Sequence, residues 1–155
     1  MLNTLSCAFF GHRDFCMNNK YEQIMEKILY QLLKDNEYVE FLVGRNGEFD
    51  RFAASCVRRA KKNFGDNNSA LVLVLPYETA EFSKNKEYFE KYYDEIEIFD
   101  AAYYKSAMHE RNCSMVDRAD LIICYVENNS GGAYKAIRYA EKRGKKIINL
   151  AVNNK

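Results

Sequence analysis

The feature that most limits the fold of this chain is an alternation of short apolar runs with segments that repeat apolar residues at helical spacing. The clearest run is ALVLVL at residues 70–75, which is typical of a strand buried on both faces. Between the runs, apolar residues recur three or four positions apart, as on one face of a helix. This alternation predicts a parallel sheet with helices on both faces.

The order of the expected elements defines the fold class. Strand-like runs cover residues 5–10, 40–43, 70–75, 96–99, 121–126 and 146–150. Helical stripes cover residues 21–33, 53–64, 84–93, 108–119 and 133–140. We therefore expect an α/β fold, a Rossmann-like three-layer sandwich whose mostly parallel sheet has about five to six strands. The 155 residues hold one proline and no low-complexity tract, which favours one domain over residues 1–155.

Charge and cysteine content limit the partners. The net charge is only +1, which argues against nucleic acid as a partner, and the basic run at residues 58–62 is interpreted as a solvated helix face. No apolar run approaches the ~20 residues of a membrane span, so we expect no membrane association. The five cysteines form no CxxC pair, so no metal site is expected and a reducing cytoplasm fits best.

Glycines gather where strand-like runs end. Of the seven glycines, Gly11, Gly44, Gly47, Gly131 and Gly132 follow expected strands. The carboxyl ends of parallel strands meet at one edge of the sheet, where ligands bind in folds of this class. We therefore expect four loops at this edge to form a ligand site.

The first loop is Gly11-His12-Arg13. Glycine lets the backbone approach a ligand, histidine donates or accepts a hydrogen bond, and arginine can grip a phosphate. A capping histidine with a surface arginine would give the same triplet, so both interpretations stay open.

The second loop runs from Gly44 to Arg51. A carboxylate at the sheet edge can bind ribose hydroxyls or act as a nucleophile or base, which makes Glu48 a candidate for binding or catalysis. Gly44 and Gly47 are candidate ligand contacts beside it. For Asp50, a cap of the next helix is the simpler interpretation.

The third loop, at residues 108–112, leads into a helix whose start faces the same edge. Arg111 and Asn112 are its candidate ligand-binding residues, whereas His109 and Glu110 fit a solvated helix face.

The fourth loop, Ser130-Gly131-Gly132-Ala133, opens the last expected helix. The free N–H groups and the dipole of a helix N-terminus favour a phosphate or carboxylate. A glycine turn that only lets helix and strand pack closely is the alternative.

An aromatic segment at residues 81–104 is the irregular part of the chain. An ordinary helix and strand with exposed tyrosines would explain it, and a lid or an oligomer contact would explain it as well. The first interpretation is simpler for Tyr88 and Tyr92, and both stay open for Tyr103 and Tyr104.

Three motifs together resemble the SLOG superfamily, named for Smf/DprA and the Lonely Guy phosphoribohydrolases, and in particular its short bacterial members. They are GHR at residues 11–13, VGRNGEFD at residues 43–50, and the segment from RNCSMVDRADLIICY to GGAYKA at residues 111–136. The resemblance covers nearly the whole chain. It implies a Rossmann-like fold, a pocket for a nucleotide or a nucleotide derivative, and a possible homo-oligomer.

One departure from the superfamily bears on chemistry. The Lonely Guy enzymes cleave the base–ribose bond of nucleoside monophosphates with motifs similar to MHxRKxxM and PGGxGTxxE. Here Arg111 matches a site arginine, Asn112 replaces the lysine, and Gly131 and Gly132 match the glycines. Arg138 stands where the catalytic glutamate belongs, and a guanidinium cannot replace a carboxylate, so the same mechanism is not expected.

We therefore expect a protein that binds a nucleotide or nucleotide-derived small molecule at the carboxyl edge of the sheet, as a sensor or binding module without a cofactor. Gly131 and Gly132 would hold its phosphate, while Arg111 and Arg13 would neutralise the charge. The alternative is an N-glycosidic hydrolase or transferase acting on a nucleoside monophosphate. Glu48 would then attack or stabilise the anomeric carbon.

Overall fold

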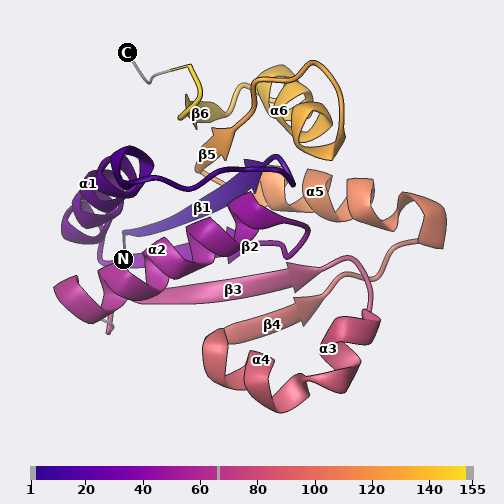
Figure 1. The fold of residues 1–155 in the computed structure, drawn as a ribbon, viewed down its shortest axis with the longest axis horizontal. Coiled ribbons are helices and arrows are strands. Elements are labelled where there is room, and N and C mark those ends of the chain that lie inside the picture. Colours follow the sequence, from indigo (N-terminus) through magenta and orange to yellow (C-terminus); the bar gives the residue numbers. More distant parts are fainter. Residues whose placement is uncertain (1–2, 66, 153–155) are drawn as a thin grey trace.

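The structure is a computed structural model that describes residues 3–65 and 67–152. Its strands are β1 Thr4–Gly11, β2 Tyr38–Val43, β3 Ser69–Leu75, β4 Glu95–Ile98, β5 Leu121–Tyr125 and β6 Lys146–Asn149 (Figure 1). Its helices are α1 Asn19–Asp35, α2 Glu48–Phe64, α3 Ala80–Lys84, α4 Lys86–Tyr92, α5 Ala107–Arg118 and α6 Gly132–Lys142, with a 3₁₀ turn, η1, at Tyr104–Ser106. The expected α/β fold is confirmed.

The six strands form one parallel sheet in the order β4-β3-β2-β1-β5-β6. Helices α1 and α2 cover one face, and α5 and α6 cover the other, which gives the expected three layers (Figure 1). The chain leaves β1 through α1 on one face and leaves β5 through α6 on the other. The strand order therefore reverses between β1 and β5, and a crevice opens beyond their carboxyl ends.

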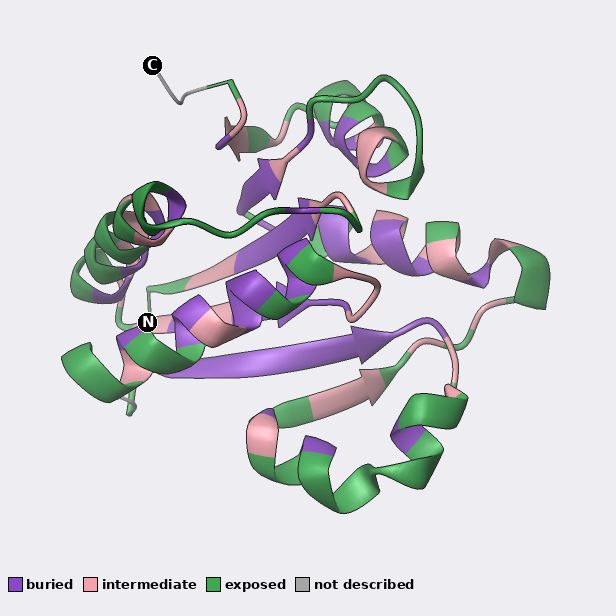
Figure 2. Ribbon diagram, viewed as in Figure 1, coloured by how far each residue is buried: buried purple, intermediate pink, exposed green. Residues whose placement is uncertain are grey.

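Burial follows the sequence pattern. Every residue of β3 is buried, as expected for the continuous apolar run (Figure 2). Cys7 in β1 and Cys124 in β5 are also buried, where they pack as small hydrophobic residues. Helix α1 begins where the carboxamide of Asn18 accepts a hydrogen bond from the Tyr21 amide at 3.0 Å, which is an N-cap.

The aromatic segment differs from the expected single helix over residues 84–93. It forms two short helices, α3 and α4, that meet at Asn85. The Asn85 carboxamide donates to the Glu81 carbonyl at 2.8 Å, and the Asn85 amide donates to the Phe82 carbonyl at 3.1 Å. Because this asparagine satisfies carbonyls at the end of α3, it ends the first helix.

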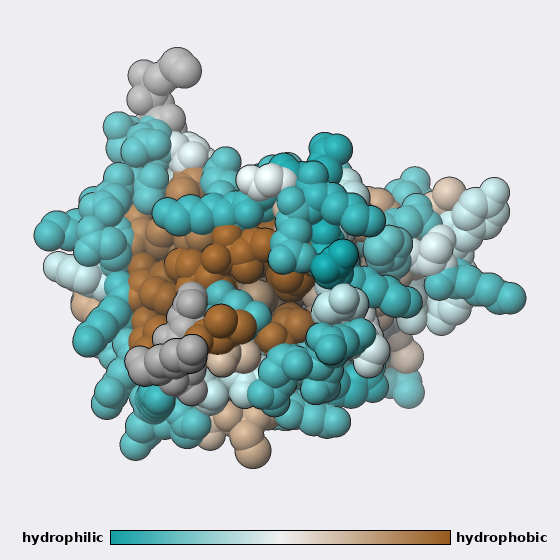
Figure 3. All heavy atoms as spheres, turned by 90° about the horizontal axis from the view of Figure 1, so that it is seen from above, coloured by the Kyte–Doolittle hydropathy of each residue, from teal (hydrophilic) through white to brown (hydrophobic). Residues whose placement is uncertain are grey.

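One face of the molecule carries an apolar area. Seen from above, Figure 3 shows a hydrophobic area framed by hydrophilic side chains. On the α1 side of the sheet, the half-buried apolar side chains that pack against the core include Leu5, Ile24, Ile28, Tyr125 and Ile148. Such a surface is compatible with self-association, which stays a prediction. Within residues 3–65 and 67–152, no helix combines the length and apolar character needed to cross a bilayer.

Candidate functional site

A pocket of about 510 Å³ lies beyond the carboxyl ends of β1, β2 and β5, between the starts of α5 and α6. It brings together nine of the residues expected from sequence: Gly11, His12, Arg13, Gly44, Arg111, Asn112, Gly131, Gly132 and Ala133. Residues that the sequence did not single out also line it: Phe9, Phe10, Asp14, Asn46, Met108, Met115, Glu127 and Asn128. Most of these lie next to a strand end or next to an expected site residue, which is the only signal the sequence offered for them.

Two expected residues lie outside this pocket. The Glu48 side chain is 59% exposed and forms an ion pair with Arg51 at 2.9 Å. Glu48 is the first residue of α2, and it borders a shallower neighbouring hollow of about 380 Å³. Gly47 packs against the first loop, because a Cβ there would lie 2.5 Å from the Arg13 Cα. The structure therefore assigns Gly47 a packing role and does not bring the Glu48 carboxylate to the other site residues.

Arg111 lies deep in the wall of the pocket and is only 2% exposed. Its guanidinium donates to the Val74 carbonyl at 2.6 Å, to the Asn112 carboxamide oxygen at 2.9 Å and to the Met108 sulfur at 3.1 Å. It therefore ties α5 to the end of β3. An arginine has five N–H donors, so two are not used in these three hydrogen bonds. Burial lowers the pKa of Arg111, while the Asp50 carboxylate opposes this shift.

Asp50 lies in the first turn of α2 and is buried. Its Oδ2 accepts a hydrogen bond from the Asn46 amide at 2.8 Å, so the side chain fixes the loop before the helix. The N-cap of α2 is Gly47, and among the described residues no side-chain hydrogen bond caps this helix, so Asp50 is not the N-cap residue that the sequence predicted. Burial raises the pKa of Asp50, while the Asn46 bond and the Arg111 charge oppose the shift. Asp50 thus both stabilises the loop and lines the pocket.

Gly44 makes room for these two charged groups. A Cβ at this position would lie 2.8 Å from Arg111 Nη1 and 3.1 Å from Asp50 Oδ2. The missing side chain therefore lets the guanidinium and the carboxylate approach the end of β2. Gly44 serves the arrangement of the site, whether or not its backbone touches a ligand.

His12 fixes the loop between β5 and α6. Its Nε2 accepts hydrogen bonds from the amides of Glu127 at 2.9 Å and Asn128 at 3.1 Å. The imidazole also lies edge-on to the Tyr125 ring, with centroids 6.2 Å apart. Of the two interpretations left open for this residue, the structure supports the capping one.

Replacing His12 by alanine is expected to loosen the loop at residues 127–131. Two backbone donors would lose their acceptor, which costs about 1–3 kcal/mol for each group that stays buried and less for exposed ones. Hydrogen exchange at the Glu127 and Asn128 amides should accelerate selectively, while the amides of β3 keep their protection. Equal acceleration in both places would indicate global destabilisation instead.

The fourth loop presents backbone donors to the pocket. Gly131 has φ +98°, a left-handed conformation that favours glycine, and it is followed directly by α6. The first N–H groups of a helix have no intrahelical acceptor, and no side chain of the described residues caps this one. A Cβ at Gly132 would meet only the Asn112 carboxamide nitrogen, at 4.0 Å. Backbone N–H groups, the helix dipole and an amide donor therefore converge on one place that suits an anion.

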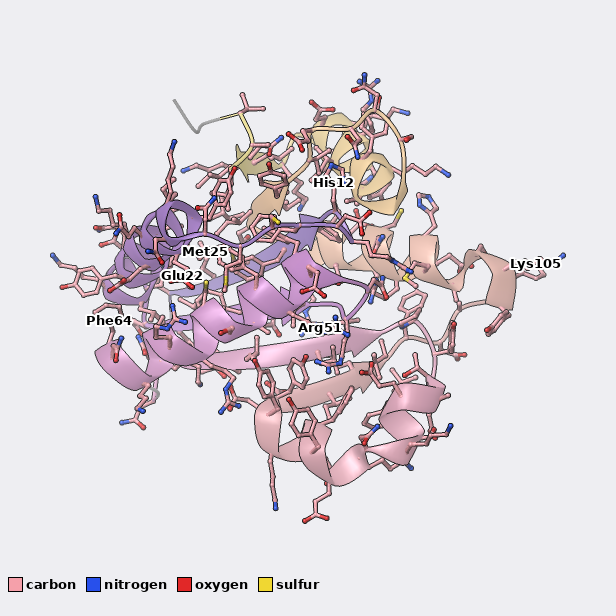
Figure 4. The ribbon with its side chains drawn as sticks, viewed as in Figure 1. His12, Glu22, Met25, Arg51, Phe64 and Lys105 are labelled. Atoms are coloured by element: carbon pink, nitrogen blue, oxygen red, sulfur yellow. The ribbon has the colours of Figure 1, made fainter. Side chains whose placement is uncertain are left out.

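The rest of the pocket is of mixed charge. Arg13, Asp14 and Glu127 are exposed and line the pocket at its rim, so the rim carries one cation and two carboxylates. Figure 4 shows His12 at the end of β1, below α6. The pocket thus offers donors on its α6 side and acceptors on its rim, an arrangement that fits a ligand with both an anionic group and hydroxyl or amino donors.

No protein-family model matches the chain, and no curated protein matches its sequence. Solved structures share its fold, among them two of DNA processing protein A. One is DNA processing protein A of Helicobacter pylori, whose structure was described for its single-stranded DNA binding mode. Its TM-score with this chain is 0.65 at 16% sequence identity, and the match covers 94% of this chain. DNA processing protein A (DprA) of Streptococcus pneumoniae has a TM-score of 0.63 at 12% identity and covers 93% of this chain.

The chain spans 64% and 49% of the lengths of these two proteins. At such low identity the likeness shows the fold alone. It confirms the Rossmann-like fold that the resemblance to the SLOG superfamily implied, because DprA gives that superfamily part of its name.

One prediction about partners is contradicted. The sequence argued against nucleic acid, yet a protein with the same fold binds single-stranded DNA. The prediction rested on a net charge of +1, which is an average over the whole chain. An average hides clusters of cations, and local clusters are what determine electrostatic contact with a phosphate backbone.

Proposed function

We propose that this chain binds single-stranded nucleic acid and that the pocket between β1, β5 and α6 holds one nucleotide of the strand. The observation that carries this proposal is the uncapped N-terminus of α6, which opens at Gly131 and Gly132 into a pocket of about 510 Å³. The phosphate would lie against these N–H groups, with Arg13 at the rim neutralising its charge.

The composition of the pocket wall supports a nucleotide rather than a bare anion. Pockets for small organic groups usually measure about 300–1,000 Å³. The Asp14 and Glu127 carboxylates at the rim can accept hydrogen bonds from a sugar hydroxyl or from a base amino group. A bare phosphate would gain nothing from these carboxylates and would be repelled by them.

The fold supports a strand as the source of that nucleotide. The structural likeness to a protein that binds single-stranded DNA is the reason to place nucleic acid first. A pocket of this size accepts one unpaired nucleotide, whereas the bases of a duplex are stacked and paired and cannot enter it.

A free nucleotide is the second candidate, and with it a role as a sensor. The observation in its favour is the size of the pocket, which matches one nucleotide. A mononucleotide that bound as tightly as an oligonucleotide would favour this candidate. Hydrolysis of an N-glycosidic bond is not proposed, because Glu48, the carboxylate on which that hypothesis rested, is exposed and paired with Arg51 outside the pocket.

The test is the replacement of Gly132 by leucine. The position has room for a side chain and no left-handed φ, so the fold should tolerate the change while the leucine covers the helix N-terminus. We expect the Kd for a labelled oligothymidylate to rise at least about tenfold, which corresponds to about 1.4 kcal/mol. Fluorescence anisotropy measures this change, and thymidine 5′-monophosphate serves as the competitor.

A matched control places leucine at Lys142, in the last turn of the same helix. It has the same new side chain at the other end of α6. Both variants should keep the melting temperature of the wild type within a few degrees. An unchanged Kd for the Gly132 variant would contradict the proposed function.

A further inference from the structure

Helix α2 carries positive charge along its exposed side. Arg51, Arg58 and Lys62 are exposed and lie seven and four positions apart, which places them on one side of the helix, with Arg59 next to them. We call these four residues the cationic stripe. From Arg51 to Lys62 it is about 16 Å long at the rise of an α-helix. Figure 4 shows Arg51 near one end of α2 and Phe64 at the other.

The stripe ends in a basic hollow of about 770 Å³ between the end of α2 and the turn from α4 to β4. The hollow is lined by cations from both elements: Arg58, Arg59, Lys61, Lys62 and Lys91. Asp94 is the carboxylate that lines it. The basic run that the sequence suggested to be a solvated helix face therefore borders a concave surface.

Two of these cations form no ion pair with the residues that the structure describes. Lys61 pairs with Asp94 at 3.0 Å, and Arg59 has a long contact of 3.9 Å with Glu22. Arg58 and Lys62 form no ion pair with any residue in the part of the chain that the structure describes. Since no carboxylate among the described residues pairs with them, these two charges can attract an anion.

Aromatic rings stand beside these cations. The Arg58 guanidinium lies 4.2 Å from the centroid of the Tyr92 ring and donates to the Tyr92 carbonyl at 2.7 Å, so it is held in place. The Tyr88 ring stacks on Tyr92 with centroids 5.8 Å apart and is itself 53% exposed. A fixed guanidinium beside an exposed ring is the combination with which proteins hold single strands, since phosphates meet the cations and bases stack on the rings.

We propose that the cationic stripe and the basic hollow form a second contact for single-stranded nucleic acid, in which the strand follows α2 and a base stacks on Tyr88. The choice of partner rests on the proposed function. The stripe begins at Arg51 in the first turn of α2, whereas the basic hollow lies at the other end of the helix and shares no lining residue with the pocket. The tyrosine rings favour nucleic acid over an acidic protein segment, and the concave shape favours it over the flat surface of a membrane.

The test neutralises two cations, Arg58→Gln with Lys62→Gln. The control, Lys27→Gln with Lys34→Gln, removes the same charge from the exposed side of α1. For an oligothymidylate of about 20 nucleotides we expect the stripe variant to bind about tenfold more weakly at low salt, and the control to bind as the wild type does. Since each phosphate contact contributes about 0.7 to the slope of log K against log salt for single strands, the slope should fall by about 1.4.

Further measurements separate the two proposals. Binding of thymidine 5′-monophosphate should be unchanged in the stripe variant and lost in the Gly132→Leu variant. Tyr88→Ala should weaken oligonucleotide binding about fivefold without changing the salt slope, because stacking involves no counterion release.

Each result that contradicts one of the two proposals can be distinguished from the others. If the stripe variant matches its control in affinity and slope, the second contact is wrong and the pocket is unaffected. If the stripe variant weakens binding while Gly132→Leu does not, the pocket proposal is wrong and the second contact holds. If the stripe variant loses binding to phosphatidylserine vesicles but keeps binding to the oligonucleotide, the assignment of this surface to nucleic acid is overturned.

Discussion

Replacing Arg111 by methionine is expected to lower the free energy of unfolding by about 3–5 kcal/mol, the usual cost of removing one member of a buried charged group. The guanidinium is nearly fully buried and donates to the Val74 carbonyl and to Asn112. Methionine fills a similar volume but donates no hydrogen bond. The Val74 carbonyl and the Asn112 carboxamide oxygen therefore lose their donor, and the Asp50 carboxylate loses the positive charge that opposes its burial cost. Urea unfolding followed by circular dichroism measures the loss.

The dependence of this loss on pH identifies its cause. Burial raises the pKa of Asp50, so the native state keeps a proton at pH values where the unfolded chain has lost it. Stability therefore falls as pH rises from about 3.9, the ordinary value of an unfolded aspartate, through the raised native value. Without Arg111 the native pKa of Asp50 rises further, so the deficit should be large at pH 7 and smaller near pH 4.

A double substitution provides the control for this prediction. Asp50→Asn keeps an oxygen that can accept from the Asn46 amide and removes the charge. Combined with Arg111→Met, it should restore part of the lost stability and abolish the pH dependence of the deficit, because neither charge remains. If the double variant were as unstable as the sum of the two single variants, the two groups would not be coupled.

Replacing Gly11 by alanine is expected to cost about 1–3 kcal/mol through overpacking. A Cβ at this position would lie 2.1 Å from Cγ and 2.5 Å from Cβ of Phe49, a side chain that is fully buried. No flexible chain end can move aside there, so the ring and α2 must shift. Thermal unfolding should show the loss as a lower melting temperature.

A smaller neighbour should relieve this clash. Phe49→Leu removes part of the ring that the new methyl group meets, so Gly11→Ala in that background should cost less than in the wild type. An equal cost in both backgrounds would mean that the strain lies elsewhere. The Gly11→Ala variant should also keep measurable ligand binding if the glycine serves packing rather than contact.

For Gly11, the sequence predicts the location of the residue, and the structure gives the reason why it is a glycine. Its place at the end of the first expected strand put it at the edge of the sheet, and in the structure it lines the pocket there. The sequence offered close backbone approach to a ligand as the reason for a glycine, whereas the structure provides another reason, the Phe49 ring of a helix that begins 37 residues later. Distances between segments far apart in the chain cannot be read from local patterns.

Glu48 and Asp50 show the same limit in a single loop. The sequence makes Glu48 the candidate for binding or catalysis and makes Asp50 a cap of the next helix. In the structure Glu48 is exposed and Asp50 is buried beside Arg111. Residues two positions apart on a helix, such as Glu48 and Asp50, are separated by about 200° around its axis at 3.6 residues per turn, so their side chains face nearly opposite ways. The sequence did not show which of the two faces the pocket.

The sequence by itself determined the layered α/β fold and the edge of the sheet at which the site lies. Hydrophobic periodicity is a local property, and the alternation of strands and helices dictates a parallel sheet with its loops at one end. Only the tertiary structure decided the composition of the pocket, the burial of Arg111 with Asp50, and the concave basic surface beside α2. These depend on how side chains from separate elements approach one another, and burial and charge are set by that packing rather than by position in the chain.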